Sequence, residues 1–141
     1  RLLKSKGVRV CFFLQFGYLG ETQEEVEQTI NMVEELMPDD IGVSVSYPLP
    51  GTKFYETVKA DLVDKANWSD SDDLAMMFRN RQAPAYYKRL HRYVHKRYRK
   101  RQSLRMWNGT DQFKPARALS ALYYVPATTI EGLRLNALIS A

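Results

Sequence analysis

The 141-residue chain has a single cysteine, Cys11, and no long apolar segment. One thiol cannot form a disulfide within the chain, so a disulfide-stabilised secreted domain is excluded. No apolar run approaches the roughly 20 residues that a membrane-spanning helix needs. The apolar stretch in residues 1–7 is too short for a signal peptide. These residues indicate instead the last turn of a helix that ends at Gly7. We therefore expect a cytoplasmic protein and, because the chain opens at a helix end without Met, part of a longer one.

Acidic residues are missing from Arg79–Arg105, although this segment holds eleven Lys and Arg. The rest of the chain has ten bases and sixteen acids, so the basic character belongs to one segment. Tyr86, Tyr87, Tyr93 and Tyr98 interleave with these cations, a mixture that nucleic-acid binders use. Two interpretations remain open. The segment is either a module that binds RNA or an acidic partner, or an amphipathic helix whose basic face meets solvent or the acidic remainder of the same protein.

Two segments have the composition of strands in a parallel sheet. Val8–Phe16 is almost wholly apolar, as in strands that are buried on both faces. Gln15 is its polar exception near the carboxyl end. Ile41–Tyr47 alternates, with large apolar side chains on one face and Gly42, Ser44 and Ser46 on the other. Small and hydroxylated side chains on an inward face indicate a cavity rather than a packed core.

A capping box separates the two strands. The Thr22 hydroxyl and the Glu25 carboxylate are spaced to satisfy each other's backbone amides, and apolar residues then recur at helical spacing as far as Met37. The order strand, helix, strand predicts a parallel βαβ unit. Ligands bind at the carboxyl ends of such strands, so we expect the site in the loops after them. Gly17–Thr22 could cradle a phosphate or carboxylate there, or form only a tight turn with a cap.

The remainder of the chain is predicted to be mainly helical. Two strands make no self-sufficient sheet, so we expect the missing strands before Arg1. An acidic loop, Asn67–Asp73, precedes the basic helix, and its aspartates lack the EF-hand spacing and indicate helix capping rather than a cation site. The expected helices span residues 54–62, 85–105, 115–123 and 130–141.

Three candidate metal ligands or nucleophiles have simpler interpretations. His91 and His95 are four residues apart, a spacing that can bind a metal ion. No carboxylate or cysteine lies near them in sequence, which favours a packing or surface role. Cys11, in an apolar strand, is predicted to be an inert core residue.

Two motifs in order carry a family resemblance: Phe13–Thr22 (FLQFGYLGET) and Ser46–Glu56 (SYPLPGTKFYE). Together they resemble the late strands of radical S-adenosylmethionine (SAM) enzymes. The most similar branch carries an N-terminal cobalamin-binding domain, as in anaerobic magnesium-protoporphyrin ester cyclases and hopanoid methylases. The resemblance covers roughly residues 1–100, including Asn67–Leu74 and the basic helix. One departure is Leu19, where the family usually has Pro.

The resemblance implies an α/β fold. The chain would be the C-terminal fragment of a partial (β/α)6 TIM-type barrel, contributing one βαβ unit, followed by a mainly α-helical extension. Three parts are expected: the end of the barrel in residues 1–62, a post-barrel helical region with the basic helix in residues 63–105, and a C-terminal extension in residues 106–141.

The resemblance also implies a function. The whole enzyme would cleave SAM reductively at a four-iron four-sulfur cluster, for radical methylation, cyclisation or similar chemistry, and cobalamin is the further cofactor of this branch. Both groups would be bound outside this chain, because the CxxxCxxC motif is absent and one cysteine cannot supply three thiolates. This fragment alone would be inactive, and would contribute a cap and part of the SAM pocket. The implied pocket residues are Gln15, Phe16, Gly17, Tyr47, Pro48 and Leu49.

The implied partners follow from the same resemblance. They are the missing N-terminal part of the protein and a small-molecule or lipid-like substrate. No transmembrane segment is expected, and nucleic acid is the less favoured partner.

Overall fold

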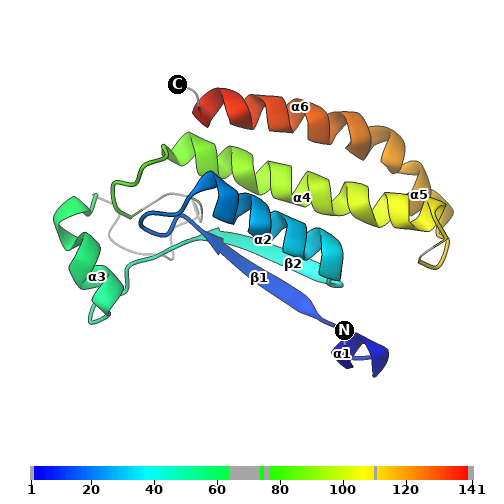
Figure 1. The fold of residues 1–141 in the computed structure, drawn as a ribbon, viewed down its shortest axis with the longest axis horizontal. Coiled ribbons are helices and arrows are strands. Elements are labelled where there is room, and N and C mark those ends of the chain that lie inside the picture. The colour runs from blue at the N-terminus through cyan, green and yellow to red at the C-terminus, as the bar shows by residue number, and fades with distance from the viewer. Residues whose placement is uncertain (1, 64–73, 75–76, 110, 140–141) are drawn as a thin grey trace.

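The computed structural model describes residues 2–63, 74, 77–109 and 111–139. It is a mixed α/β structure with a two-stranded parallel sheet in the described residues. Strand β1 (Cys11–Phe16) pairs with β2 (Asp40–Val45) so that Gln15 lies opposite Ser44, and helix α2 (Gln23–Leu36) joins the two (Figure 1). The predicted parallel βαβ unit is confirmed.

The capping box predicted for α2 is present. The Thr22 hydroxyl accepts a hydrogen bond from the Glu25 amide at 3.3 Å, and the Glu25 carboxylate accepts one from the Thr22 amide at 2.8 Å. At the other end, Met37 has a left-handed backbone with φ of 45°, and its N–H returns to the carbonyl of Val33. Lys4 donates a hydrogen bond of 2.6 Å to the Met37 carbonyl, which places a cation at the negative end of the helix.

Among the described residues, helices cover one face of the sheet and leave the other exposed. Leu14 and Phe16 of β1 lie in the core with α2 and are at most 5% exposed. Cys11, Phe13 and Gln15 point the other way and are exposed, Phe13 by 72%. The prediction that this strand is buried on both faces is therefore wrong for the described chain, and so is the placement of Cys11 in the core. Alternation of side chains along a strand assigns each residue to one face of the sheet, but it does not determine which face packs against helices.

The basic helix lies in the middle of the molecule. Helix α4 (Pro84–Trp107) packs against α2 and β2 on one side and against α6 (Ala121–Ile139) on the other (Figure 1). Its apolar stripe, predicted from spacing, is buried in the core. The stripe consists of Tyr87, Leu90, Val94 and Tyr98, each at most 4% exposed.

The C-terminal helices differ from the prediction. Helix α5 (Pro115–Leu119) is shorter than expected, and α6 is one helix that begins at Ala121 and continues through Pro126. A proline inside a helix removes a hydrogen bond and costs about 3 kcal/mol. Contacts with α4 along α6 offset that cost, which local sequence signals could not reveal.

The shorter elements lie at opposite ends of the sheet. Helix α1 (Leu2–Ser5) precedes β1, while α3 (Lys53–Val58) and the 3-10 helix η1 (Lys59–Asp61) follow β2 near the carboxyl ends of the strands. Beyond η1, Leu62 forms an antiparallel bridge with Phe78. The predicted acidic loop Asn67–Asp73 lies outside the described residues. Among the helices that the structure describes, none has the length and apolar character to cross a membrane.

Candidate ligand site at the carboxyl ends of the strands

A pocket of about 220 Å³ lies where both strands end. Its walls are mostly apolar, and they come from the loop after β1, the loop after β2 and the start of α3. Parallel strands open their carboxyl ends toward the same edge, which is the usual ligand edge of α/β proteins. The lining residues are Gln15, Tyr18, Ser46, Tyr47, Leu49, Thr52 and Phe54.

Ser46 provides an unpaired polar group in this pocket. The residue is only 2% exposed, and its Oγ has no hydrogen-bond partner among the residues that the structure describes. Its backbone N–H, in contrast, donates to the carbonyl of Phe16 at 2.8 Å and holds the two strand ends together. A buried hydroxyl without a partner costs about 1–3 kcal/mol. Such a group at the wall of a pocket is suited to bind a polar atom of a ligand.

Gln15 and Tyr18 form the polar edge of the pocket. The Tyr18 hydroxyl donates a hydrogen bond of 2.9 Å to Gln15 Oε1. This bond leaves the Gln15 amide group as a donor, and among the described residues no hydrogen bond from Nε2 is found. The Tyr18 ring lies 6.0 Å from the ring of Phe54, which in turn makes an edge-to-face contact with Phe78 at 5.4 Å. The pocket therefore combines aromatic walls with an amide donor and a hydroxyl.

A carboxylate of the glycine loop after β1, that of Glu21, binds a backbone amide of the same loop. Gly17 and Gly20 both have φ of +83°, a backbone conformation that favours glycine. The Gly17 N–H donates a hydrogen bond of 2.8 Å to Glu21. Burial raises the pKa of Glu21, the Gly17 hydrogen bond lowers it, and the charge of Glu25 raises it, with a net result above the ordinary value. Of the two interpretations of this loop, the tight capped turn is therefore the one that forms. The Gly17 N–H, which a bound phosphate would need, already donates to Glu21.

Asn80 fixes the same loop from a distance. Its Nδ2 donates hydrogen bonds to the Gly17 carbonyl at 2.8 Å and to the Tyr87 hydroxyl at 3.1 Å. Burial, and then the charge of Glu21, raise the pKa of Tyr87, so this hydroxyl stays protonated. Sequence analysis missed Asn80 because it lies 63 residues from Gly17, outside every local motif.

A tight turn shapes the second wall. The Thr52 N–H donates to the Leu49 carbonyl at 3.1 Å, with Gly51 between them at φ of +84°. Proline followed by a left-handed glycine is the pattern of a type II turn. Thr52 then begins α3, since its hydroxyl accepts a hydrogen bond from the Tyr55 amide at 3.1 Å.

The structure brings half of the six predicted site residues together. Gln15, Tyr47 and Leu49 line the pocket. The Phe16 side chain lies in the core, while both backbone polar groups of Gly17 are engaged within the protein. Pro48 is fully buried and is not a lining residue.

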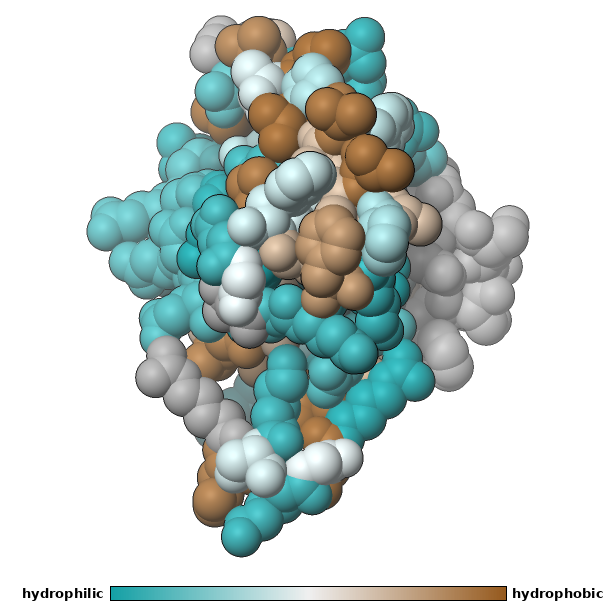
Figure 2. Space-filling view, turned by 90° about the vertical axis from the view of Figure 1, so that its right-hand side faces the viewer, coloured by the Kyte–Doolittle hydropathy of each residue, from teal (hydrophilic) through white to brown (hydrophobic). Residues whose placement is uncertain are grey.

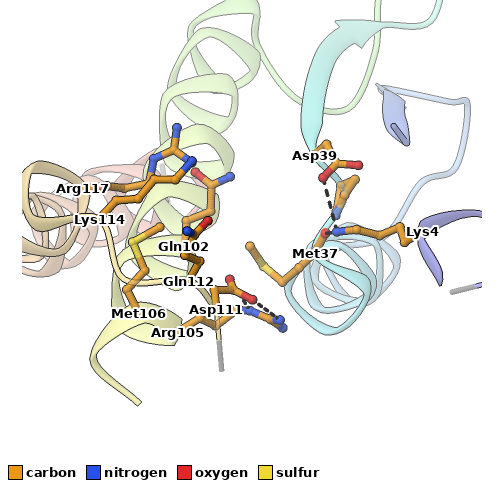
Figure 3. A pocket seen from close by; sticks show the side chains of 11 residues that line it. Lys4, Met37, Asp39, Gln102, Arg105, Met106, Asp111, Gln112, Lys114 and Arg117 are labelled. Carbon is orange, nitrogen blue, oxygen red and sulfur yellow. Dashed lines mark hydrogen bonds and ion pairs between the residues drawn. The ribbon is translucent and has the colours of Figure 1, made fainter. Parts of the chain in front are cut away.

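A second cavity, of about 230 Å³, lies at the amino ends of the strands (Figure 3). Its charges are partly paired: Arg105 donates two hydrogen bonds to Asp111, at 2.9 and 2.7 Å, and Lys4 lies 3.5 Å from Asp39. In Figure 3, the Arg117 side chain extends toward the cavity from the opposite wall to Lys4 and Asp39. This end of a parallel sheet is not the usual ligand edge.

Much of the basic segment is used inside the molecule. Arg97 contacts Glu27 and Glu34 of α2, so its basic face docks on an acidic part of the same chain, as one of the two interpretations anticipated. Three of the four tyrosines expected to stack on bases are buried, and the fourth, Tyr93, is half-buried with Arg97 over its ring. Tyr86 and Tyr98 are each 1% exposed and belong to the core. The cations and the buried tyrosines therefore lie on two different surfaces of α4.

The two histidines of α4 contact each other. The rings of His91 and His95 have centroids 4.5 Å apart. Burial, together with neighbouring cations, lowers the pKa of both, which favours neutral rings. In the described residues, no group of three or more His, Cys, Asp or Glu side chains could hold a metal ion.

Comparisons of the chain with protein-family models, with curated proteins and with solved structures found no match.

Proposed function

We propose that this chain is part of a radical SAM enzyme and that its pocket holds part of SAM. The observation that carries the proposal is the buried Ser46 hydroxyl, without a partner in the described part of the chain, in an aromatic pocket at the carboxyl ends of two parallel strands. The two motifs that resemble the family, FLQFGYLGET and SYPLPGTKFYE, supply the residues of this pocket. Position, chemistry and resemblance thus converge on the same loops.

The pocket suits a nucleoside. The rings of Tyr18 and Phe54 provide an apolar surface for a base, while the Gln15 amide and the Ser46 hydroxyl provide polar contacts. Its volume of about 220 Å³ is below the 300–1,000 Å³ that is usual for complete ligand sites. We infer that further strands of the same protein complete it.

The sheet supports the same inference. A two-stranded sheet is marginal by itself, and in the described residues β1 pairs only with β2. The exposed face with Phe13 and Gln15 would become the interior of a partial (β/α)6 barrel. The α4–α6 region would then form its helical cap.

The chain does not supply the ligands for an iron–sulfur cluster, since it has one cysteine. In the proposed enzyme, the cluster would be bound elsewhere and would supply the electron that cleaves SAM. The role of this chain is to position SAM: Gln15 and Ser46 orient its polar atoms, and the aromatic wall excludes water. Cobalamin, the further cofactor of this branch, would also bind outside these residues.

The decisive experiment measures SAM affinity of the full-length protein after anaerobic reconstitution. Gln15→Leu and Ser46→Ala should each weaken binding by about one to two decades, because each removes a hydrogen bond in a buried site. Arg101→Ala is the control, since this exposed cation lies on α4 outside the pocket. Wild-type affinity in both pocket variants would place the site elsewhere. The upstream gene sequence gives an independent check, because the proposal requires a CxxxCxxC motif there.

The alternative function, an RNA-binding or acidic-partner module, has less support. Three of its four stacking tyrosines are buried, and Arg89, Lys96 and Arg97 are paired with carboxylates of the same chain. A site that recognises single-stranded nucleic acid needs exposed aromatic faces beside its cations.

A further inference from the structure

Helix α6 carries its acid inside and its large apolar side chains outside. Glu131 and Thr128 face α4 and are at most 5% exposed. Leu122, Ile130 and Leu133 point away from α4 and are 79%, 49% and 66% exposed. A helix packed on a soluble domain normally has the reverse arrangement.

The inward acid is neutralised by the basic helix. Glu131 accepts hydrogen bonds from Arg89 at 2.7 Å and from Lys96 at 2.6 Å. Burial raises the pKa of Glu131, but the hydrogen bonds and charges of Lys96 and Arg89 together outweigh it and leave the pKa below its ordinary value. The ion pairs fix which side of α6 faces α4, and they thereby fix which side faces outward. Gly132 assists, because its lack of a side chain lets the Tyr93 ring approach the helix.

Four exposed apolar residues define a surface that we call the outer face of α6: Leu122, Pro126, Ile130 and Leu133. They recur every three or four positions and include no charged residue. Figure 2 shows hydrophobic side chains gathered in the upper part of the molecule, where α6 lies, above a largely hydrophilic lower part. Trp107, the last residue of α4, and Phe113, in the loop before α5, are 58% and 56% exposed. Their rings are in edge-to-face contact.

The surroundings of this face are strongly cationic. Residues 84–139 contain twelve Lys and Arg and only two acids. Both acids are already paired, Glu131 as described and Asp111 with Arg105 at 2.7 Å. Arg92 and Arg134 are exposed cations on α4 and α6. No free negative charge therefore accompanies the apolar surface in the described part of residues 84–139.

We propose that the outer face of α6 docks on an anionic membrane surface. Leucine and aromatic side chains beside Lys and Arg are the pattern of helices that lie in the plane of a lipid interface. Anionic lipids attract such cations, and the apolar side chains enter the boundary of the acyl region. This membrane contact is compatible with the proposed enzyme but does not depend on that proposal, because α6 lies on the far side of α4 from the sheet.

Charge decides against two other occupants. A second copy seated on the same face would bring two strongly cationic helix pairs together, which like-charge repulsion opposes. RNA would be attracted by the cations but would leave the leucines in water, and Tyr86, Tyr87 and Tyr98 of the basic helix are buried and cannot stack on its bases. An anionic lipid surface satisfies both the apolar and the cationic parts.

The test is vesicle co-sedimentation of the purified chain. Vesicles of phosphatidylcholine mixed with phosphatidylglycerol should bind it at least about tenfold more tightly than phosphatidylcholine alone, and added salt should weaken binding. Leu122→Gln/Leu133→Gln should lower the affinity at least about tenfold. The matched control is Leu2→Gln/Leu3→Gln, which changes two leucines on α1 that are 74% and 57% exposed and should stay within about twofold of wild type. Circular dichroism of each variant confirms that it is folded.

Several results would overturn the proposal. Absence of binding to anionic vesicles would do so, as would equal loss of binding in the two leucine pairs. A dimer in light scattering that only Leu122→Gln/Leu133→Gln abolishes, without vesicle binding, would assign the face to a second copy. Tight binding of single-stranded RNA without vesicle binding would assign the cations to nucleic acid. Arg92→Gln/Arg134→Gln separates the charge contribution, because it should remove the preference for anionic lipid and keep the fold.

Discussion

Arg97 on α4 donates two hydrogen bonds to the carboxylate of Glu34 on α2, from Nε at 3.0 Å and from Nη2 at 2.7 Å. The Arg97 side chain is only 12% exposed, and the same guanidinium also contacts Asn31 at 3.1 Å. Its hydrogen bonds to the carboxylates of Glu34 and Glu27 outweigh burial and raise the pKa of Arg97. The planar guanidinium thus joins the basic helix to the acidic face of the βαβ unit.

Replacement of Arg97 should destabilise the fold. Arg97→Ala removes this bidentate contact and leaves Glu34 without it, so we expect a loss of about 2–3 kcal/mol in the free energy of unfolding. Arg97→Lys should recover only part, because an ammonium cannot donate in a fork. Urea denaturation measures both. The control Arg101→Ala, at an exposed site on the same helix, should change stability by no more than about 0.5 kcal/mol.

The buried pair at Glu131 predicts a pH dependence. The folded-state pKa of Glu131 lies below its ordinary value, so its contribution to stability is fully present above the ordinary pKa and is lost as the pH falls through the folded value. Glu131→Gln should be less stable than wild type by about 1–3 kcal/mol at pH 7. The difference should shrink below about pH 4. Denaturation series at several pH values test this, and a difference that stays constant down to pH 3 would exclude the carboxylate charge as its source.

Ser46 should show a conflict between stability and binding. Its hydroxyl is buried and has no partner among the described residues, so Ser46→Ala is expected to leave the free energy of unfolding unchanged or to raise it by up to about 1 kcal/mol. Ser44→Ala is the matched control on the same strand, because Ser44 Oγ donates to the Val45 carbonyl at 3.3 Å and its loss should cost about 0.5 kcal/mol. Thermal or chemical denaturation distinguishes the two. Clear destabilisation by Ser46→Ala would mean that the hydroxyl has a partner in the folded protein.

In this chain studied by itself, Cys11 should react readily, whereas the proposed barrel would cover it in the full-length protein. It is exposed on the uncovered face of β1, although its apolar neighbours predicted a buried site. A thiol reagent such as a maleimide should modify it in buffer at a rate within about tenfold of the rate in urea. Protection by several decades would show that something covers this face in solution.

Local patterns were sufficient for the parts of the fold that depend on neighbours in sequence. Alternation in the two strands, the capping box at Thr22 and the stripe through Leu90 and Val94 predicted the parallel βαβ unit and the long helix. The glycines and prolines after the strands also predicted where the pocket would lie, and Gln15, Tyr47 and Leu49 are on its walls.

Only the tertiary structure decided which faces are covered and which polar groups find partners. The Asn80 contact to Gly17 and the ion pairs of Glu131 with Arg89 and Lys96 join residues 35 or more positions apart. Such contacts leave no periodic trace in the sequence. They fix the glycine loop at the pocket and turn the apolar side of α6 outward. Side-chain spacing defines the faces of a helix or strand, but packing and ion pairing between distant segments determine which of those faces meets solvent.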